Sequence, residues 1–141
     1  MDNTLEFFTQ ITKGLAHLRG RMKNLARHLS AAFPNLTACE RIDFAEYEQN
    51  FFPERAPKCV IEAFIDLRFD VGKSFCWWVD VERINDLLNV EASIRRDDGT
   101  GEDTLWERTY QAATLEDLFL HLSSALDEFE RFANQKLRNV T

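Results

Sequence analysis

The fold is decided by the stretch CVIEAFIDLRFDVGKSFCWWVDVE, residues 59–82. Apolar side chains occupy every second position of residues 59–70, and this period of two indicates a half-buried strand. Residues 71–73 make a tight turn, and the alternation resumes over residues 74–83. Because the turn is short, we expect the two strands to pair as an antiparallel hairpin.

The segments on either side of this hairpin complete the pattern. Alternation predicts two further strands at residues 89–96 and 104–111, joined by a loop that contains two glycines. Apolar residues recur every three or four positions over residues 4–33 and again over residues 115–138, which predicts an amphipathic helix at each end. We therefore expect strands in the middle of the chain and helices outside them.

The segment between the first helix and the hairpin, residues 34–58, follows neither period well. A short helix over residues 43–51 and a short strand near residues 41–45 both fit its apolar residues. Prolines mark turns at both ends of the segment. We interpret it as a connection that carries one short element.

Together these elements predict an α+β fold. A four-stranded antiparallel meander with the N- and C-terminal helices packed on one face would bury every apolar stripe. The chain has 141 residues, of which 45% are hydrophobic and 29% charged, values typical of one globular domain. We expect residues 1–141 to form a single domain.

The charge of the chain is acidic and unevenly spread. Residues 1–33 hold five basic and two acidic residues, a net +3, so the rest must carry −10 to reach the total of −7. An acidic surface argues against nucleic-acid binding. The basic first helix could lie on a membrane surface, but a solvated outer face on a core-packed helix fits an otherwise acidic chain better.

The chain shows no sign of a signal peptide and no apolar run of about 20 residues. We therefore expect a cytoplasmic protein without membrane association. The sequence does not indicate its oligomeric state.

A catalytic or cofactor constellation does not emerge from the sequence. Glycine-rich phosphate loops, a nucleophile elbow and zinc-ligand spacings are all missing from it, so we predict no cofactor, no metal and no enzymatic activity. Cys76 with a helix histidine is the one Cys–His pair that can be constructed. Asp66 with Asp80 could act as an acid–base pair, although strand carboxylates are usually solvated. The acidic loop at residues 97–103 lacks the EF-hand spacing for calcium.

The sheet face opposite the helices is the predicted site. Large aromatic side chains alternate there with carboxylates, a composition that resembles the anchors and charges of protein interfaces. Two other interpretations are a solvated face with cross-strand ion pairs and a face covered by residues 34–58. The predicted partner-binding residues are Glu62, Phe64, Asp66, Trp78, Asp80, Glu82 and Glu91.

Four segments resemble a known class of proteins: FIDLRFD at 64–70, FCWWVDVE at 75–82, VEASI at 90–94 and ATLEDL at 113–118. They are similar to the strand core and closing helix of small acidic immunity proteins from bacterial polymorphic-toxin and contact-dependent inhibition systems. The resemblance implies a cytoplasmic antitoxin that binds one cognate toxin domain, often a basic nuclease, and blocks it by occlusion or distortion. It implies no catalytic residue.

Two other functional classes fit the same sequence. An acidic secretion or export chaperone would bind an extended effector segment, for example by strand addition. A small enzyme or ligand-binding module would need a deep pocket with convergent polar groups.

Overall fold

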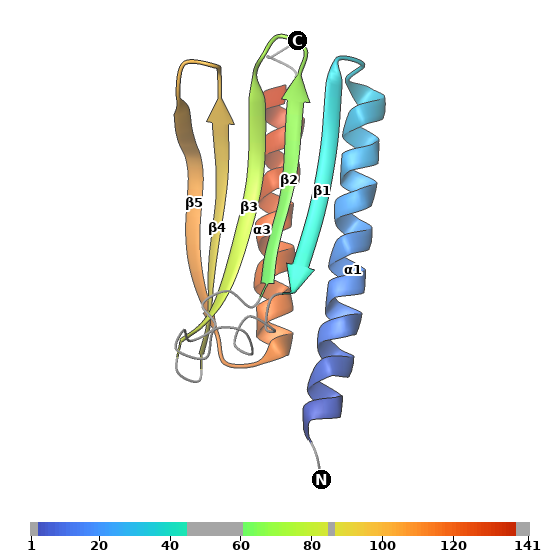
Figure 1. Ribbon diagram of the computed structural model, residues 1–141, viewed down its shortest axis with the longest axis vertical. Coiled ribbons are helices and arrows are strands. Elements are labelled where there is room, and N and C mark those ends of the chain that lie inside the picture. Colours follow the sequence, from blue (N-terminus) through green and yellow to red (C-terminus); the bar gives the residue numbers. More distant parts are fainter. Residues whose placement is uncertain (1–2, 45–60, 85–86, 138–141) are drawn as a thin grey trace, which may run out of the picture.

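The computed structural model describes residues 3–44, 61–84 and 87–137 and folds them into two helices and a five-stranded antiparallel sheet (Figure 1). The predicted α+β class is therefore right. In chain order, the elements are α1 (Asn3–Ala32), β1 (Leu36–Phe44), β2 (Ile61–Phe69), β3 (Ser74–Ile84), β4 (Leu87–Asp97), β5 (Glu102–Ala112) and α3 (Leu115–Lys136).

The sheet is a meander in which each strand pairs with the next, in the order β1-β2-β3-β4-β5. Every pair is antiparallel, and the short connections after β2 require this for the pairs from β2 to β5. The predicted meander is thus right in topology, but the number of strands is five rather than four.

The additional strand is β1, which the sequence analysis treated as part of a connection. It pairs along its whole length with β2, from Leu36 opposite Phe69 to Phe44 opposite Ile61. The strand alternative is therefore right for residues 41–44, and residues 45–51 lie outside the described residues. The pattern was hard to detect because Glu40 interrupts the inward-facing row of β1. That side chain shares a small surface cavity with basic residues of α1, which explains why a charge is tolerated there.

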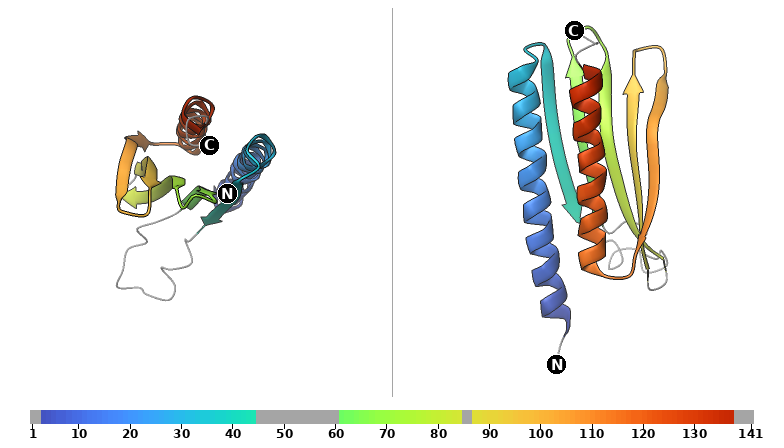
Figure 2. Two further views of the ribbon diagram at one scale, coloured as in Figure 1. Left: turned by 90° about the horizontal axis from the view of Figure 1, so that it is seen from above. Right: turned by 180° about the vertical axis from the view of Figure 1, so that it is seen from behind.

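Both helices lie on the same face of the sheet, as predicted (Figure 2). α1 packs against β1 and α3, and α3 packs across β4 and β5. The apolar stripe of α1, including Leu18 and Met22, is buried in the core. Arg21 on the polar side of α1 donates a hydrogen bond to Asp127 of α3 at 2.6 Å. The core-packed interpretation of α1 is therefore favoured over a membrane-surface helix.

Trp77 of β3 is the central side chain of the core. It is fully buried, and its ring stacks on Phe129 of α3 with ring centroids 6.3 Å apart. Its indole Nε1 donates a hydrogen bond to the carbonyl oxygen of Ala125 at 3.1 Å. A buried Trp needs such a partner, and here the partner connects the middle strand to the closing helix.

β5 is an edge strand with one irregularity. Trp106 and Tyr110 pair with Ile94 and Val90, so the predicted alternation of this strand is right at these positions. A shift of register next to Ile94 leaves Leu105 as an extra residue in β5. This β-bulge changes the side of the sheet on which the following residues lie.

Candidate binding face

The structure places all seven predicted partner-binding residues on one face of the sheet, the face opposite the helices, which we call the outer face. Along β2, β3 and β4 the residues of the outer face alternate with fully buried core residues. Six of the seven are half-buried and Glu91 is exposed. One interpretation was that residues 34–58 cover this face. Residues 36–44 instead form strand β1 at the edge of the sheet, and residues 45–58 lie outside the described residues.

Phe64 and Trp78 form an aromatic pair at the centre of the outer face. They are opposite each other in the register of β2 and β3, and their rings stack with centroids 5.7 Å apart and an interplanar angle of 12°. Cross-strand aromatic pairs stabilise a sheet by about 0.2–1 kcal/mol. The pair is thus already held in a fixed orientation, as an interface anchor should be.

A row of acidic residues runs beside the aromatic pair. Asp43 is opposite Glu62, Glu62 is opposite Asp80, and Asp80 is opposite Glu91, so four neighbouring strands each contribute one carboxylate. We call these four residues the acidic row. Carboxylates placed opposite each other in this way concentrate negative charge on this part of the outer face. Asp43 forms an ion pair with Arg41 at 2.9 Å. It was missed because the strand near residues 41–45 was only one of two alternatives and its faces were not assigned.

Asp66 lies on the other side of the aromatic pair, in a more neutral environment. Its carboxylate accepts a hydrogen bond from Arg68 Nε at 2.8 Å, and its register partners are Cys39 and Cys76. Burial, followed by the negative charge of Asp66, raises the pKa of the Cys76 thiol to about 11. Cys76 is therefore protonated at neutral pH and is a poor nucleophile.

The catalytic alternatives of the sequence analysis gain no geometric support. His121 stacks on Tyr110 on the helix-covered side of the sheet, whereas Cys76 lies on the outer face, so these two side chains do not meet. Asp66 and Asp80 share the outer face, but the row of the aromatic pair separates them. The carboxylates of the acidic loop bind within that loop, as with Asp97 and Asp98, or pair with arginines.

Comparison with known proteins leaves the chain without a named relative, because no protein-family model, curated protein or solved structure matches it. Among the described residues, no helix combines the length and apolar character needed to cross a membrane. The same residues contain no group of three or more His, Cys, Asp or Glu side chains suited to a metal ion. The outer face is therefore the candidate site on which sequence pattern and fold agree.

Proposed function

We propose that this protein binds a basic protein partner through the outer face and neutralises it by occlusion, without catalysing a reaction. The observation that carries the proposal is the stacked Phe64–Trp78 pair next to the acidic row. Stacked aromatics offer a rigid apolar anchor, and the carboxylates offer a field that attracts a positively charged surface.

The charge of the acidic row supports a basic partner. Its four carboxylates lie side by side across β1 to β4. Lysine or arginine side chains of a partner would be attracted to this concentration of negative charge.

The proposed partner is a cognate bacterial toxin domain, which makes the protein an immunity protein acting in the cytoplasm. The support is the net charge of −7 and the resemblance of the strand core to acidic immunity proteins. Occlusion requires surface complementarity and no catalytic group, which suits a face of carboxylates and aromatic rings.

Binding to the product of the adjacent upstream gene tests the proposal, with isothermal titration calorimetry as the measurement. We expect Trp78→Ala and Asp80→Lys each to weaken binding by about tenfold or more, because central aromatic and charged anchors typically contribute above 1.4 kcal/mol. Asp70→Lys is the matched control: it makes the same charge change at an exposed position in the β2–β3 turn. Unchanged affinity in both outer-face variants would remove this surface from the proposal.

Limited proteolysis of the complex separates inhibition from chaperoning. We expect a compact partner domain to survive digestion, because occlusion acts on a folded toxin. A partner that is digested to one short bound segment would contradict the proposal and indicate an export chaperone instead.

A further inference from the structure

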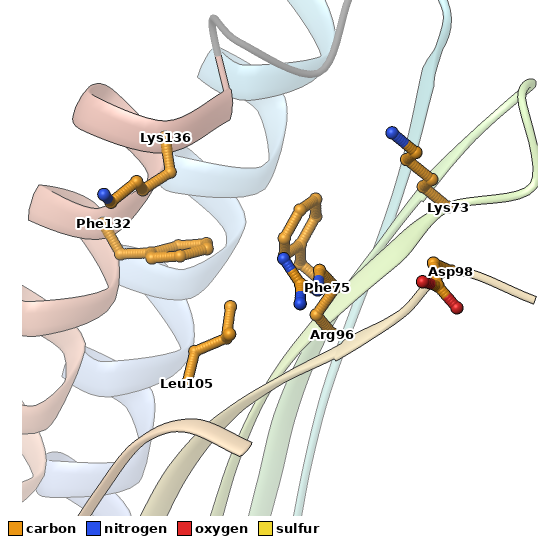
Figure 3. Close-up of a pocket in the computed structure, with 7 residues that line it drawn as sticks. All are labelled: Lys73, Phe75, Arg96, Asp98, Leu105, Phe132 and Lys136. Atoms are coloured by element: carbon orange, nitrogen blue, oxygen red, sulfur yellow. The ribbon is translucent and has the colours of Figure 1, made fainter. Parts of the chain in front are cut away.

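A cavity of about 600 Å³ lies between α3 and the sheet, at the end where α3 finishes (Figure 3). This volume is within the range of about 300–1,000 Å³ that small-molecule sites occupy. The cavity is on the helix-covered side, so it is separate from the outer face. Its lining residues are Lys73, Phe75, Arg96, Asp98, Leu105, Phe132 and Lys136.

One wall of the cavity is apolar. Phe132 reaches from α3 toward Phe75 of β3, and the two ring centroids are 5.4 Å apart. Leu105 completes this wall because of the bulge in β5: Trp106 and Thr104 pair with consecutive residues of β4, which leaves Leu105 between them without a register partner. Bulges re-aim side chains and are frequent beside functional sites. Here the bulge brings a 40%-exposed leucine to the cavity.

The lining also carries a cation, Arg96, which is the register partner of Phe75 on the neighbouring strand β4. The inward-facing row of β4 is apolar up to Ile94, and the next inward position is Arg96. Arg96 Nη2 donates to Asp103 Oδ2 at 2.8 Å, while its Nε is buried and has no hydrogen-bond partner among the described residues. A buried donor without an acceptor is costly. Proteins depart from local rules of this kind mainly at functional sites.

The charge around the cavity is positive although the chain is acidic. Lys73 and Lys136 join Arg96, and Asp98 is the single acid among the lining residues. Asp98 already accepts hydrogen bonds from the backbone N and the Oγ1 of Thr100, at 2.9 and 2.6 Å. Its carboxylate therefore stabilises its own loop. Lys136 is in the last turn of α3, where the negative end of the helix dipole offsets part of its charge. Arg96 is paired with Asp103 through Nη2 but still has one donor, its Nε, without an acceptor in the described part of the chain, so it is the lining cation to test first for anion binding.

We propose that this cavity binds a small organic anion with an aromatic or aliphatic body. The apolar body would lie against Phe75, Phe132 and Leu105. The carboxylate, sulfonate or phosphate group would face Arg96 and Lys136. The proposal does not depend on the function of the outer face.

Fluorescence titration with 8-anilinonaphthalene-1-sulfonate tests the site, because this dye is an aromatic anion that brightens in apolar surroundings. We expect Arg96→Met to weaken dye binding by about tenfold, the size of one charge-assisted contact. Arg131→Met is the matched control, since it removes one arginine charge from α3 next to Phe132 without altering the lining. It should bind the dye like the wild type.

A neutral dye of the same shape, N-phenyl-1-naphthylamine, separates charge recognition from apolar binding. We expect it to bind the wild type more weakly than the sulfonate and to be insensitive to Arg96→Met. Equal binding of the two dyes would overturn the proposal. So would an equal loss in Arg96→Met and Arg131→Met.

A second variant keeps the test decisive if Arg96→Met folds poorly. Lys136→Met lies in the exposed last turn of α3, and we expect it to weaken sulfonate binding about threefold, with an unchanged circular dichroism spectrum. If both single variants fold, wild-type dye affinity in both would overturn the proposal. If Arg96→Met does not fold, wild-type dye affinity in Lys136→Met alone would overturn it. Trp78→Ala, on the outer face, should leave dye binding unchanged, so failure here and failure of the proposed function can be distinguished.

Discussion

At the scale of single residues, Cys76 shows how position on the sheet controls chemistry. It lies on the outer face beside Asp66, and burial followed by that negative charge raises its pKa from 9.0 to about 11. At pH 9 the thiolate fraction should therefore be roughly 1%, against about half for an ordinary thiol. We expect Cys76 to react with iodoacetamide far more slowly than Cys39, whose side chain is exposed.

Peptide mapping by mass spectrometry over time measures this difference. The reaction of Cys76 should accelerate as the pH rises from 9 to 11, because the thiol loses its proton across that window. The raised pKa also means that the folded state holds this proton more tightly than the unfolded state does. The contribution of Cys76 to stability is therefore complete below pH 9 and is lost as the pH passes about 11. Rapid alkylation of Cys76 at pH 9 would contradict the assigned burial.

The positions of some of these single residues could be predicted from the sequence, and others could not. The outer-face positions on β2, β3 and β4 followed from a period of two, because polar and apolar side chains separate cleanly on those strands. Asp43 did not follow, since the strand near residues 41–45 was only one of two alternatives and its faces were not assigned. Leu105 also escaped, because its place at the cavity depends on a bulge, and the register of β4 with β5 is a tertiary property. Arg96 escaped because it is a charged residue at the end of the apolar row of β4.

At the scale of elements, Gly14 of α1 lies directly against Phe119 of α3. A Cβ atom added there would overlap the ring of Phe119 on α3, whereas Gly20 has nothing within 4 Å of the same atom. From the sequence alone, each of the two glycines lowers helix stability by about 1 kcal/mol relative to alanine. Their surroundings differ, because an alanine at Gly14 would overfill the contact with Phe119, and overfilling costs about 1–3 kcal/mol of stability.

We therefore predict opposite effects for two identical substitutions. Gly20→Ala should raise the free energy of unfolding by about 0.5–1 kcal/mol, and Gly14→Ala should lower it by about 1 kcal/mol. Urea unfolding followed by circular dichroism measures both. In a Phe119→Ala background, Gly14→Ala should become stabilising, since the overlapping ring is gone. If Gly14→Ala and Gly20→Ala raised the free energy of unfolding equally in the wild-type background, the contact between Gly14 and Phe119 would adjust at no cost, which would contradict the prediction.

Element prediction from sequence was accurate where one face is strongly apolar. The two helices and the strands from β2 to β5 were found within about two residues of their ends, with α1 observed at Asn3–Ala32 and α3 at Leu115–Lys136. For β1 only the end, residues 41–44, was anticipated as one of two alternatives, because it is an edge strand with Glu40 in its inward row. Such a strand is specified by pairing with β2 and by cover from α1 more than by its own pattern.

At the scale of the whole molecule, the two faces of the sheet differ in composition: one is apolar and the other carries charged side chains. The helix-covered face holds the core, from Trp77 outward, while the outer face carries the acidic row. The acidic row leads to a prediction about stability that is independent of any partner. Removing the charge of Glu91 should stabilise the free protein, because Glu91 lies directly opposite Asp80.

Glu91→Gln provides this test, because Glu91 is exposed and faces Asp80 across β3 and β4. We expect it to raise the free energy of unfolding by about 0.3–0.5 kcal/mol in low salt, the usual size of a like-charge pair. The gain should disappear in 1 M salt, where the screening length is about 3 Å. Glu107→Gln is the control: Glu107 is also exposed on the outer face, but its register partner is the neutral Ser93. The free energy of unfolding of the Glu107→Gln variant should therefore change little. A loss of stability in Glu91→Gln, or the same gain in both variants, would mean that the carboxylates of the row are compensated within the fold and need no basic partner.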